Sequence, residues 1–479
     1  MLTSVRSSST SLNRALPAVF QTQRFYAAKV LTAEQYSERP TQSIGEFQSS
    51  SLPNGLSLAT VNTEVPLSAV GVFVKAGSRH ESSEFRGASH FLKHFAFQRT
   101  STRSPLRVCR EFELTAGDYT CGVTREHIVY SSQFQRQKLG EVVPMLSDVL
   151  SPLIREWVVR DLKPVVIEET LEAERDPDTQ LVEALHTTAF RHTGLGNSLF
   201  CPTYRTSAIT PDLLNAYHNS RFQPHNITLV GVGVDHEEFV ELASKHFGGA
   251  ATSQGGKPQK EASKYAGGEA LLPDPNNTRL AIAFEGLSNT DKDRFALLTL
   301  SSLLGGSERY SKDGPGRGLR SRLYTNLVAK NEFVTAASTF NAAYSDAGLW
   351  GVYAEAQPQH GAALAEQLTA ELANVRKQSA SGIAAEELTR AKNHAKSVLL
   401  RGLESESAQA SLLPFVALQR SVSEQLLTPA QLCEHVDKVT AEDVSRVAQR
   451  LLKGNPTVVV TGDVVGAPLG ASIKSAIGL

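Results

Sequence analysis

The sequence predicts an α+β fold built from two homologous α/β-sandwich domains joined by a central linker. Two observations indicate a duplication: both halves of the chain begin with a strand that leads into a helix, and both have a helix followed by an apolar strand near their ends. A further observation locates the linker: the stretch 251–277 is rich in Gly, Pro, Lys, Ser and Gln and lacks periodicity. With 479 residues, the chain is long enough for two cores.

The ends of the two halves follow the same local rules. Thr210 before Pro211 predicts a helix start, and the apolar run Ile227–Val234 predicts the strand that follows. Much later, Thr440 opens a capping-box-like helix start, and Pro456–Val464 predicts the matching strand. We therefore expect each half to finish with a helix, a turn and a strand.

The beginnings match in the same way. Residues 66–76 and 278–286 are predicted strands, and they lead into predicted helices at 87–97 and 291–304. The expected organisation is a presequence at 1–26, an amino-terminal domain at 27–250, a linker at 251–277 and a carboxy-terminal domain at 278–479.

The amino-terminal segment predicts a mitochondrial location. Up to Ala33 it contains no acid, yet it carries arginines and many serines, which is typical of a transit peptide. The sequence Arg24-Phe25-Tyr26-Ala27 is similar to the cleavage pattern of matrix presequences, with the cut after Tyr26. The alternative is a disordered polar tail.

Composition argues against several classes of function. The formal net charge is −1 and no basic cluster is interleaved with aromatics, so nucleic acid is not an expected partner. The four cysteines form no C-x-x-C pair, which argues against a zinc knuckle and a disulfide framework. The apolar runs are shorter than the roughly 20 residues that span a bilayer, so membrane association is expected only through partners.

The segment His90-Phe91-Leu92-Lys93-His94 reads as an inverted zinc-peptidase motif with the wrong residue at its catalytic position. Two histidines four apart on a helix share one face, as a zinc site requires, and Glu169 in a helix-like run is the natural third ligand. The motif needs a glutamate where Lys93 stands, and an ammonium with a reference pKa of ~10.4 cannot accept the proton of a metal-bound water. We expect no catalytic residue, no cofactor and no bound metal, with His90, His94 and Glu169 as vestigial zinc candidates.

Two further features carry weaker functional signals. The glycine cluster 305–318 is interrupted by charged residues, and it reads either as a substrate-contacting loop or as a mobile surface loop. An acidic run could line a cleft for a basic peptide, although such runs are more often the solvated face of a helix; it comprises Glu168, Glu169, Glu172, Glu174, Asp176 and Asp178.

Residues 87–97 resemble the active-site helix of the mitochondrial processing peptidase family, and the resemblance extends over nearly all of the chain after the presequence. It implies that His90 and His94 match the zinc histidines, that Lys93 replaces the catalytic glutamate, and that Glu169 matches the distal ligand. The family includes the core proteins of respiratory complex III. The segments 196–202, 265–269 and 340–349 resemble core protein 2 most, although core protein 2 often lacks both histidines.

The resemblance implies a non-catalytic scaffold and assembly subunit, core protein 2 of ubiquinol–cytochrome c reductase. Its implied partners are core protein 1 or a processing peptidase β-like subunit, together with cytochrome b, cytochrome c1 and the Rieske protein, on the matrix side of the inner membrane. The alternative is the substrate-recognising, non-catalytic α subunit of the processing peptidase, which would bind presequence peptides; the glycine cluster is its main support. An active peptidase resting on His90, His94 and Glu169 comes last.

Overall fold

The structure is a computed structural model, and it describes most of the chain after the amino-terminal segment. The described residues are 47–63, 66–248, 262–274, 277–309, 319–377, 382–404, 408–422, 426–462, 464 and 470–478. The expected presequence at 1–26 lies outside them. Among the described helices, none combines the length and the apolar character that crossing a bilayer requires.

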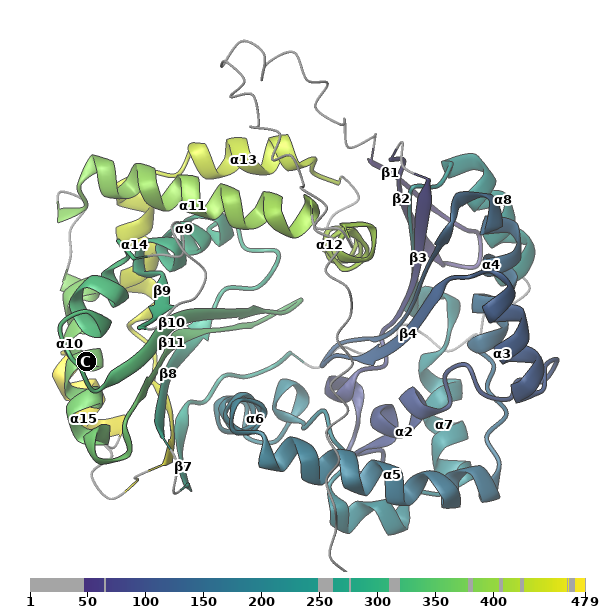
Figure 1. The fold of residues 1–479 in the computed structure, drawn as a ribbon, viewed down its shortest axis with the longest axis horizontal. Coiled ribbons are helices and arrows are strands. Elements are labelled where there is room, and N and C mark those ends of the chain that lie inside the picture. Colours follow the sequence, from purple (N-terminus) through teal and green to yellow (C-terminus); the bar gives the residue numbers. More distant parts are fainter. Residues whose placement is uncertain are drawn as a thin grey trace, which may run out of the picture. The chain divides into compact units, whose positions relative to one another are not determined.

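The first half contains one six-stranded sheet in the order β1-β2-β6-β3-β5-β4 (Figure 1). Its strands are β1 (Phe47–Ser51), β2 (Ser57–Val61), β3 (Leu67–Val74), β4 (Asp118–Val123), β5 (Ile128–Gln135) and β6 (Ile227–Val232). Its helices are α2 (Ala88–His94), α3 (Pro105–Leu114), α4 (Leu139–Val149), α5 (Glu156–Arg175), α6 (Pro177–Ala189), α7 (Pro211–Arg221) and α8 (His236–Phe247).

The second half contains another six-stranded sheet, in the order β7-β12-β8-β11-β10-β9. Its strands are β7 (Gly268–Pro273), β8 (Thr278–Gly286), β9 (Gly306–Glu308), β10 (Val334–Ala343), β11 (Gly348–Ala356) and β12 (Thr457–Gly462). Its helices are α9 (Arg294–Leu304), α10 (Gly361–Lys377), α11 (Ala385–Glu404), α12 (Ala408–Val422), α13 (Pro429–Asp437), α14 (Ala441–Leu451) and α15 (Gly470–Ile477).

Five strands of each sheet follow the same topology. The order β2-β6-β3-β5-β4 in the first sheet corresponds to β7-β12-β8-β11-β10 in the second, with strands taken in the same sequence order. The directions also agree, because β2 and β6 are parallel, β7 and β12 are parallel, and the other neighbouring pairs are antiparallel. The sheets differ only at their edges, where the first adds β1 and the second adds β9. The predicted duplicated α+β fold is confirmed.

The repeated ends of the two halves are longer than the sequence analysis expected. Thr210 caps α7 by accepting the Leu213 N–H, and Thr440 forms a capping box with Asp443 at the start of α14, as their sequences predicted. Each is followed by a fully buried strand, β6 or β12. A further helix then follows, α8 in the first half and α15 in the second, so the repeated unit is helix, strand, helix.

Part of the expected linker belongs to the second sheet. Residues 268–273, inside the predicted linker 251–277, form β7, which pairs in parallel with β12 along its whole length. The Tyr265 hydroxyl, three residues earlier, lies 2.7 Å from the Asn455 carbonyl oxygen and 2.8 Å from the Thr457 hydroxyl. The second half therefore begins before residue 278. Residues 249–261 lie outside the described part, and the domain boundaries remain a prediction.

Each sheet is covered on one face by helices of its own half. In the first half, the core between the sheet and helices such as α2, α4 and α7 includes Phe91, Leu146 and Tyr217. In the second half, the equivalent core includes Leu300 of α9 and Leu368 of α10. These two clusters supply most of the buried apolar surface, which is the main favourable contribution to folding.

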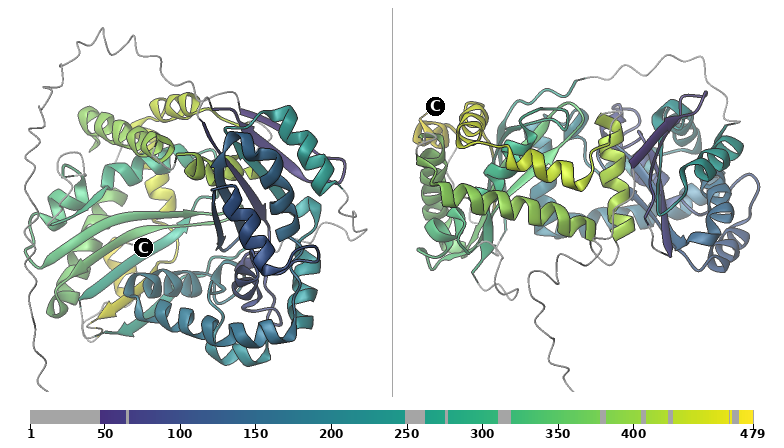
Figure 2. Two further views of the ribbon diagram at one scale, coloured as in Figure 1. Left: turned by 45° about the vertical axis from the view of Figure 1, so that its right-hand side comes forward. Right: turned by 90° about the horizontal axis from the view of Figure 1, so that it is seen from above.

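The opposite face of each sheet is covered by a helix from the other half. Leu412, Leu413, Val416 and Ala417 of α12 pack on β2, β3 and β6 of the first sheet. Leu181, Leu185 and Ala189 of α6 pack on β7, β8 and β12 of the second. Figure 2 shows α12, which follows α11 along the chain, lying against the first sheet when seen from above. The two halves thus exchange one helix each.

A buried ion-pair network adds a polar connection between the halves. The Arg79 guanidinium, whose side chain is 3% exposed, donates to Glu126 Oε1 at 2.8 Å and to Asp346 Oδ1 at 2.6 Å. Asp346 lies in the turn between β10 and β11, and its carboxylate also accepts the Ser263 N–H at 3.0 Å. Glu126 accepts the Ser345 N–H at 3.2 Å. Both carboxylates therefore have several donors, as buried charges require.

Candidate functional site

The short helix α2 carries the histidine pair, and the residue just before the helix, Gly87, fixes where the helix starts. Gly87 precedes α2 with φ of +90°, a conformation that favours glycine. A Cβ atom at Gly87 would lie 2.4 Å from the Sγ atom of Cys201, so there is also no space for a side chain. These two constraints hold the start of α2 against the buried segment around Cys201.

Glu81 caps the same helix end from outside the helix. Its carboxylate accepts the N–H groups of Gly87 and Ser89, each at 2.7 Å, and the Ser89 hydroxyl at 2.6 Å. Burial raises the pKa of Glu81 to about 7, although these hydrogen bonds and the charge of Arg86 act in the opposite direction. A fully buried carboxyl group thus holds the orphan donors of the helix that presents the motif.

Helix α5 brings Glu169 to the histidines. Its buried side is marked by Val159, Val166 and Thr170, and the Thr170 hydroxyl donates to the Val166 and Cys201 carbonyl oxygens at 2.8 and 3.0 Å. Glu169, next to Thr170, keeps 31% of its side chain exposed. Helices α2 and α5 contact each other, and Glu169 projects from α5 towards α2.

Three side chains converge on one carboxylate oxygen of Glu169. Glu169 Oε2 lies 2.8 Å from His90 Nε2, 3.0 Å from Lys93 Nζ and 3.1 Å from His94 Nε2. Within the described residues, His90, His94 and Glu169 form a group whose ligand-type atoms all lie within 4.8 Å of one another. The structure therefore brings together the three residues that the sequence proposed as metal ligands, and it places Lys93 among them.

The hydrogen bond at the other side of the His90 ring fixes where its proton lies. The backbone N–H of Cys201 donates to His90 Nδ1 at 3.1 Å. Because Nδ1 must supply the lone pair for this bond, a neutral His90 carries its proton on Nε2 and donates it to Glu169. Both ring nitrogens of His90 are then engaged in hydrogen bonds.

The charges of the cluster balance without an added cation. Burial lowers the pKa of His90 to about 4, outweighing the opposing effect of Glu169, and burial also lowers the pKa of His94. Burial alone would raise the pKa of Glu169, but the hydrogen bonds from His90 and Lys93 and the nearby charges bring it down to about 2. At neutral pH the cluster thus holds two neutral imidazoles, one carboxylate and one ammonium.

The residue types suit zinc, but their arrangement does not. Zinc requires a free imidazole lone pair at about 2.0–2.1 Å, and it needs the second ring nitrogen to donate to an acceptor. His90 has the opposite arrangement. Its Nδ1 accepts a hydrogen bond from the Cys201 N–H, and its Nε2 carries the proton that is donated to Glu169, so no lone pair faces the place where zinc would lie. The Lys93 ammonium adds a positive charge 3.0 Å from the would-be ligand oxygen. No catalytic step through a metal follows from this geometry, and the absence of bound metal remains a prediction.

The acidic run stays outside the cluster except for Glu169. Glu168, Glu172 and Glu174 are exposed on α5, and Asp178 is exposed near the start of α6. Asp176 caps α6 by accepting the Thr179 N–H at 3.1 Å. Most of these acids therefore face solvent.

The described part of the glycine cluster has a structural role. Gly305 has φ of +60° and Gly306 has φ of +150°, and a Cβ at Gly306 would lie 2.3 Å from backbone atoms of β10. These glycines let β9 leave α9 and pair with β10. The remainder of the cluster, 310–318, lies outside the described residues.

Sequence reasoning missed two groups that shape the site. The Cys201 backbone N–H sets the His90 tautomer, and Glu81 caps the helix. A backbone donor leaves no residue-type signal in a sequence. Glu81 follows a predicted strand as an ordinary acid, and only its burial in the folded structure distinguishes it.

Two family models match this chain. The model described as Insulinase (Peptidase family M16) matches residues 57–203, which include α2 and α5. The model described as Peptidase M16 inactive domain matches residues 208–394. Together they cover most of the described part of both halves.

Curated relatives match over most of their length. The mitochondrial-processing peptidase subunit alpha-2 of Dictyostelium discoideum is 32% identical over 89% of this chain and 94% of its own. A probable mitochondrial-processing peptidase subunit alpha of Schizosaccharomyces pombe is 32% identical over 91% and 90%, respectively. The human mitochondrial-processing peptidase subunit alpha is 30% identical over 90% and 85%.

These relatives show that the expectation of core protein 2 of complex III was wrong. The segments that suggested it perform structural tasks: the Asn197 amide donates to the carbonyl oxygens of Ser78 and Glu81, Tyr265 anchors β7, and Asp346 binds Arg79. Similarity in such segments follows from the shared fold, and it does not distinguish one subunit type of the family from another. The expected complex III partners and the expected position at the inner membrane were part of that assignment and are not supported either. The expected mitochondrial location agrees with the names of the relatives.

Both family models and these relatives agree on the class of protein. The chain belongs to the insulinase family of peptidases, family M16.

Proposed function

We propose that this chain is the substrate-recognising, non-catalytic α subunit of a mitochondrial processing peptidase. The observation that carries the proposal is the ammonium of Lys93 on Glu169 Oε2, at the position where an active peptidase of this motif holds its general base. The names of the relatives support the choice of subunit. A protonated lysine has no lone pair for a proton of water, so peptide hydrolysis needs another chain.

The proposed partner is a processing peptidase β-like subunit with an intact H-x-x-E-H motif. Such a subunit would supply the metal, the general base and the activated water. The proposed place of the pair is the mitochondrial matrix, where presequences arrive. This chain would contribute binding surface for the substrate and for its partner.

The proposed substrate is the basic presequence of an imported protein. The exposed carboxylates of Glu168, Glu172 and Glu174 on α5 support this choice, because a row of negative charges attracts arginine-rich peptides. Such attraction acts mainly on the rate of encounter, and it weakens as salt rises.

A reconstitution experiment tests the proposal. The full chain, the β-like subunit and the mixture of both are each incubated with a fluorogenic presequence peptide. We expect no cleavage by this chain alone and a large gain in cleavage rate when it is added to the β-like subunit. Cleavage by this chain alone, or a β-like subunit that is equally active without it, would contradict the proposal.

The acidic surface is tested in the same assay. A variant with Glu168→Gln, Glu172→Gln and Glu174→Gln should raise KM for the presequence peptide more than it lowers kcat, with a larger effect at low salt. A matched variant with Glu237→Gln, Glu238→Gln and Glu241→Gln removes three charges from α8 and should leave KM unchanged. Equal effects of both variants would show that the carboxylates of α5 have no special part in binding.

A further inference from the structure

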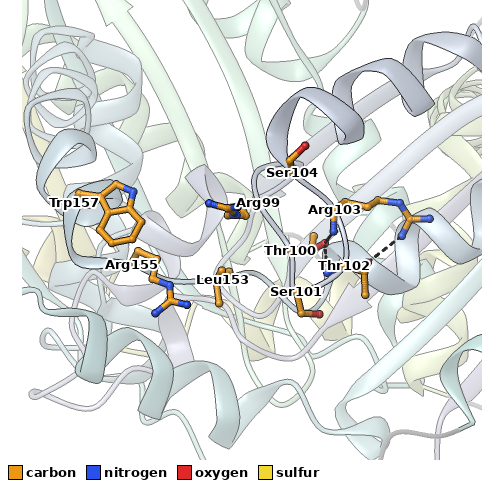
Figure 3. Close-up of a pocket in the computed structure, with 9 residues that line it drawn as sticks. All are labelled: Arg99, Thr100, Ser101, Thr102, Arg103, Ser104, Leu153, Arg155 and Trp157. Carbon is orange, nitrogen blue, oxygen red and sulfur yellow. Dashed lines mark hydrogen bonds between the residues drawn. The ribbon is translucent and has the colours of Figure 1, made fainter.

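A positively charged pocket lies on the first half between the start of α3 and the start of α5. Its volume is about 340 Å³, within the range of roughly 300–1,000 Å³ that small-molecule sites occupy. Figure 3 shows Trp157 and Arg155 to one side, the loop that leads into α3 to the other, and Arg99 with Leu153 between them. The nine lining residues include three arginines and four hydroxyl side chains, and none of the nine is acidic.

The loop that forms one wall of the pocket is held in place by hydrogen bonds. The Thr100 hydroxyl oxygen accepts the N–H groups of Thr102 and Arg103, at 3.3 and 3.0 Å, and the hydroxyl donates to Asp148. The Leu153 N–H donates to the Arg99 carbonyl oxygen at 2.9 Å, which joins the loop to the segment before α5. A wall that is already ordered loses little entropy when a ligand binds.

Two acids near the pocket, Asp148 and Glu111, are already paired. Asp148, in the adjoining cavity, accepts hydrogen bonds from Thr100 and Thr102 and lies 3.0 Å from Arg103 Nη1. Glu111 accepts from Arg103 and Arg107. Arg103 is therefore neutralised and serves the scaffold of the pocket.

Arg99 and Arg155 supply the free positive charge. Within the described residues, neither guanidinium makes a hydrogen bond or an ion pair, although both are exposed at the pocket. The Ser101 hydroxyl, on the same wall as Arg99, also has no partner among those residues. Several donors and two charges thus face one cavity whose lining residues include no acid.

We propose that this pocket binds a phosphate group carried by a soluble metabolite or by a phospholipid headgroup. Two guanidiniums and nearby hydroxyls offer more donors than the two oxygens of a carboxylate can accept, whereas the terminal oxygens of a phosphate can engage them together. Trp157, which is 53% exposed at the rim, offers a flat apolar surface for the organic part of the ligand. This site is independent of the proposed function in peptide processing.

The two tryptophans of the chain make the binding directly measurable. Trp350 is fully buried in the second half, so only Trp157 can report on a ligand at the pocket. The full-length protein is titrated with inorganic pyrophosphate while tryptophan emission is recorded. In parallel, it is sedimented with vesicles of phosphatidylcholine alone or of phosphatidylcholine mixed with phosphatidic acid.

Three arginine substitutions separate specific binding from general charge attraction. Arg99→Gln and Arg155→Gln should each weaken binding by about tenfold or more, because each removes charge-assisted hydrogen bonds. Arg160→Gln is the matched control: it removes the same charge from an exposed arginine of α5 that pairs with Asp161 and does not line the pocket. Trp157→Phe should abolish the emission change, which assigns the signal to the tryptophan at the pocket.

The results identify the source of the phosphate or overturn the site. Saturable quenching by pyrophosphate that is lost in the Arg99 and Arg155 variants supports a soluble phosphate ligand. Sedimentation with phosphatidic acid vesicles, lost in the same variants and without a response to pyrophosphate, supports a lipid headgroup. No response in either assay, or equal loss in all three arginine variants, overturns the proposal.

Discussion

The Lys93 ammonium lies 3.0 Å from Glu169 Oε2, the same oxygen atom that His90 Nε2 and His94 Nε2 contact. The general base of an active zinc peptidase is here replaced by a cation that binds the metal ligand itself. The carboxylate thus obtains from within the chain the positive charge that a metal would otherwise supply. We propose that the cluster acts as an internal ion pair and not as a metal centre.

The first prediction concerns zinc. The purified wild-type protein should contain far less than one zinc per chain by inductively coupled plasma mass spectrometry. Lys93→Glu should raise zinc affinity by about tenfold or more, because it replaces a repelling charge with an attracting one within a few ångströms. Zinc at one per wild-type chain, lost in His94→Ala, would refute the assignment of the cluster as an ion pair.

The second prediction concerns Glu169 and pH. Its folded pKa of about 2 lies below the ordinary 4.5, so the stabilisation is complete above pH 4.5 and is lost as pH falls towards 2. Glu169→Gln should lower the free energy of unfolding by about 1–2 kcal/mol at neutral pH, with a smaller deficit near pH 3. Urea unfolding at several pH values measures this. Glu168→Gln, at an exposed neighbour, should change stability by less than about 0.5 kcal/mol.

The third prediction concerns Glu81, whose linkage has the opposite sign. Its folded pKa of about 7 lies above the ordinary 4.5, so between these values the folded state holds a proton that the unfolded state has released. Stability from this group therefore falls as pH rises through that window. The glutamine of Glu81→Gln cannot ionise, and its NH₂ group would face a donor that the carboxylate now accepts from. The loss of this hydrogen bond should lower the free energy of unfolding by about 1–3 kcal/mol.

The difference in free energy of unfolding between the wild type and Glu81→Gln should become smaller as pH rises from 5 towards 7.5. Over this range the wild type loses stability because Glu81 must ionise, whereas the glutamine cannot. Urea unfolding at both ends of the range gives the comparison. Glu84→Gln provides the exposed control from the same segment. A deficit that stays constant over this pH range would show that Glu81 is ionised throughout.

The fourth prediction concerns the ion pairs between the halves. Arg79→Met leaves two carboxylates without their cation and should lower the free energy of unfolding by about 3–5 kcal/mol. Adding Asp346→Asn should recover part of this loss, and the double-mutant cycle measures the coupling. Arg175→Met, which breaks an exposed pair with Glu168, should cost less than about 1 kcal/mol. Equal losses for both arginines would contradict a special role for Arg79.

Local rules predicted the elements better than their assembly. The strand Thr278–Gly286 was predicted over its whole length, and the caps at Thr210 and Thr440 were located, because apolar runs and capping chemistry are properties of neighbouring residues. The exchange of α6 and α12 was not predicted, because it depends on contacts between residues far apart in the chain. β7 was missed because its strand is short and partly exposed at the sheet edge.

The sequence predicted which residues meet at the site, but it did not predict the hydrogen bonds among them. His90, His94 and Glu169 follow from helical spacing and ligand chemistry, and the structure brings them together. The tautomer of His90 depends on the Cys201 backbone, which no residue pattern reveals. The subunit assignment failed because residues such as Asn197 and Asp346 hold the fold together, so their likeness to another protein does not distinguish functions.

The exchanged helices also set an order of events during synthesis and import. A chain that emerges amino terminus first completes the strands of its first sheet long before Leu412 and Val416 of α12 exist to cover them. Until then Ala59, Val61 and Phe73 present a bare apolar surface to every other nascent chain. The first sheet therefore stays open to aggregation until the residues of α12 have been made.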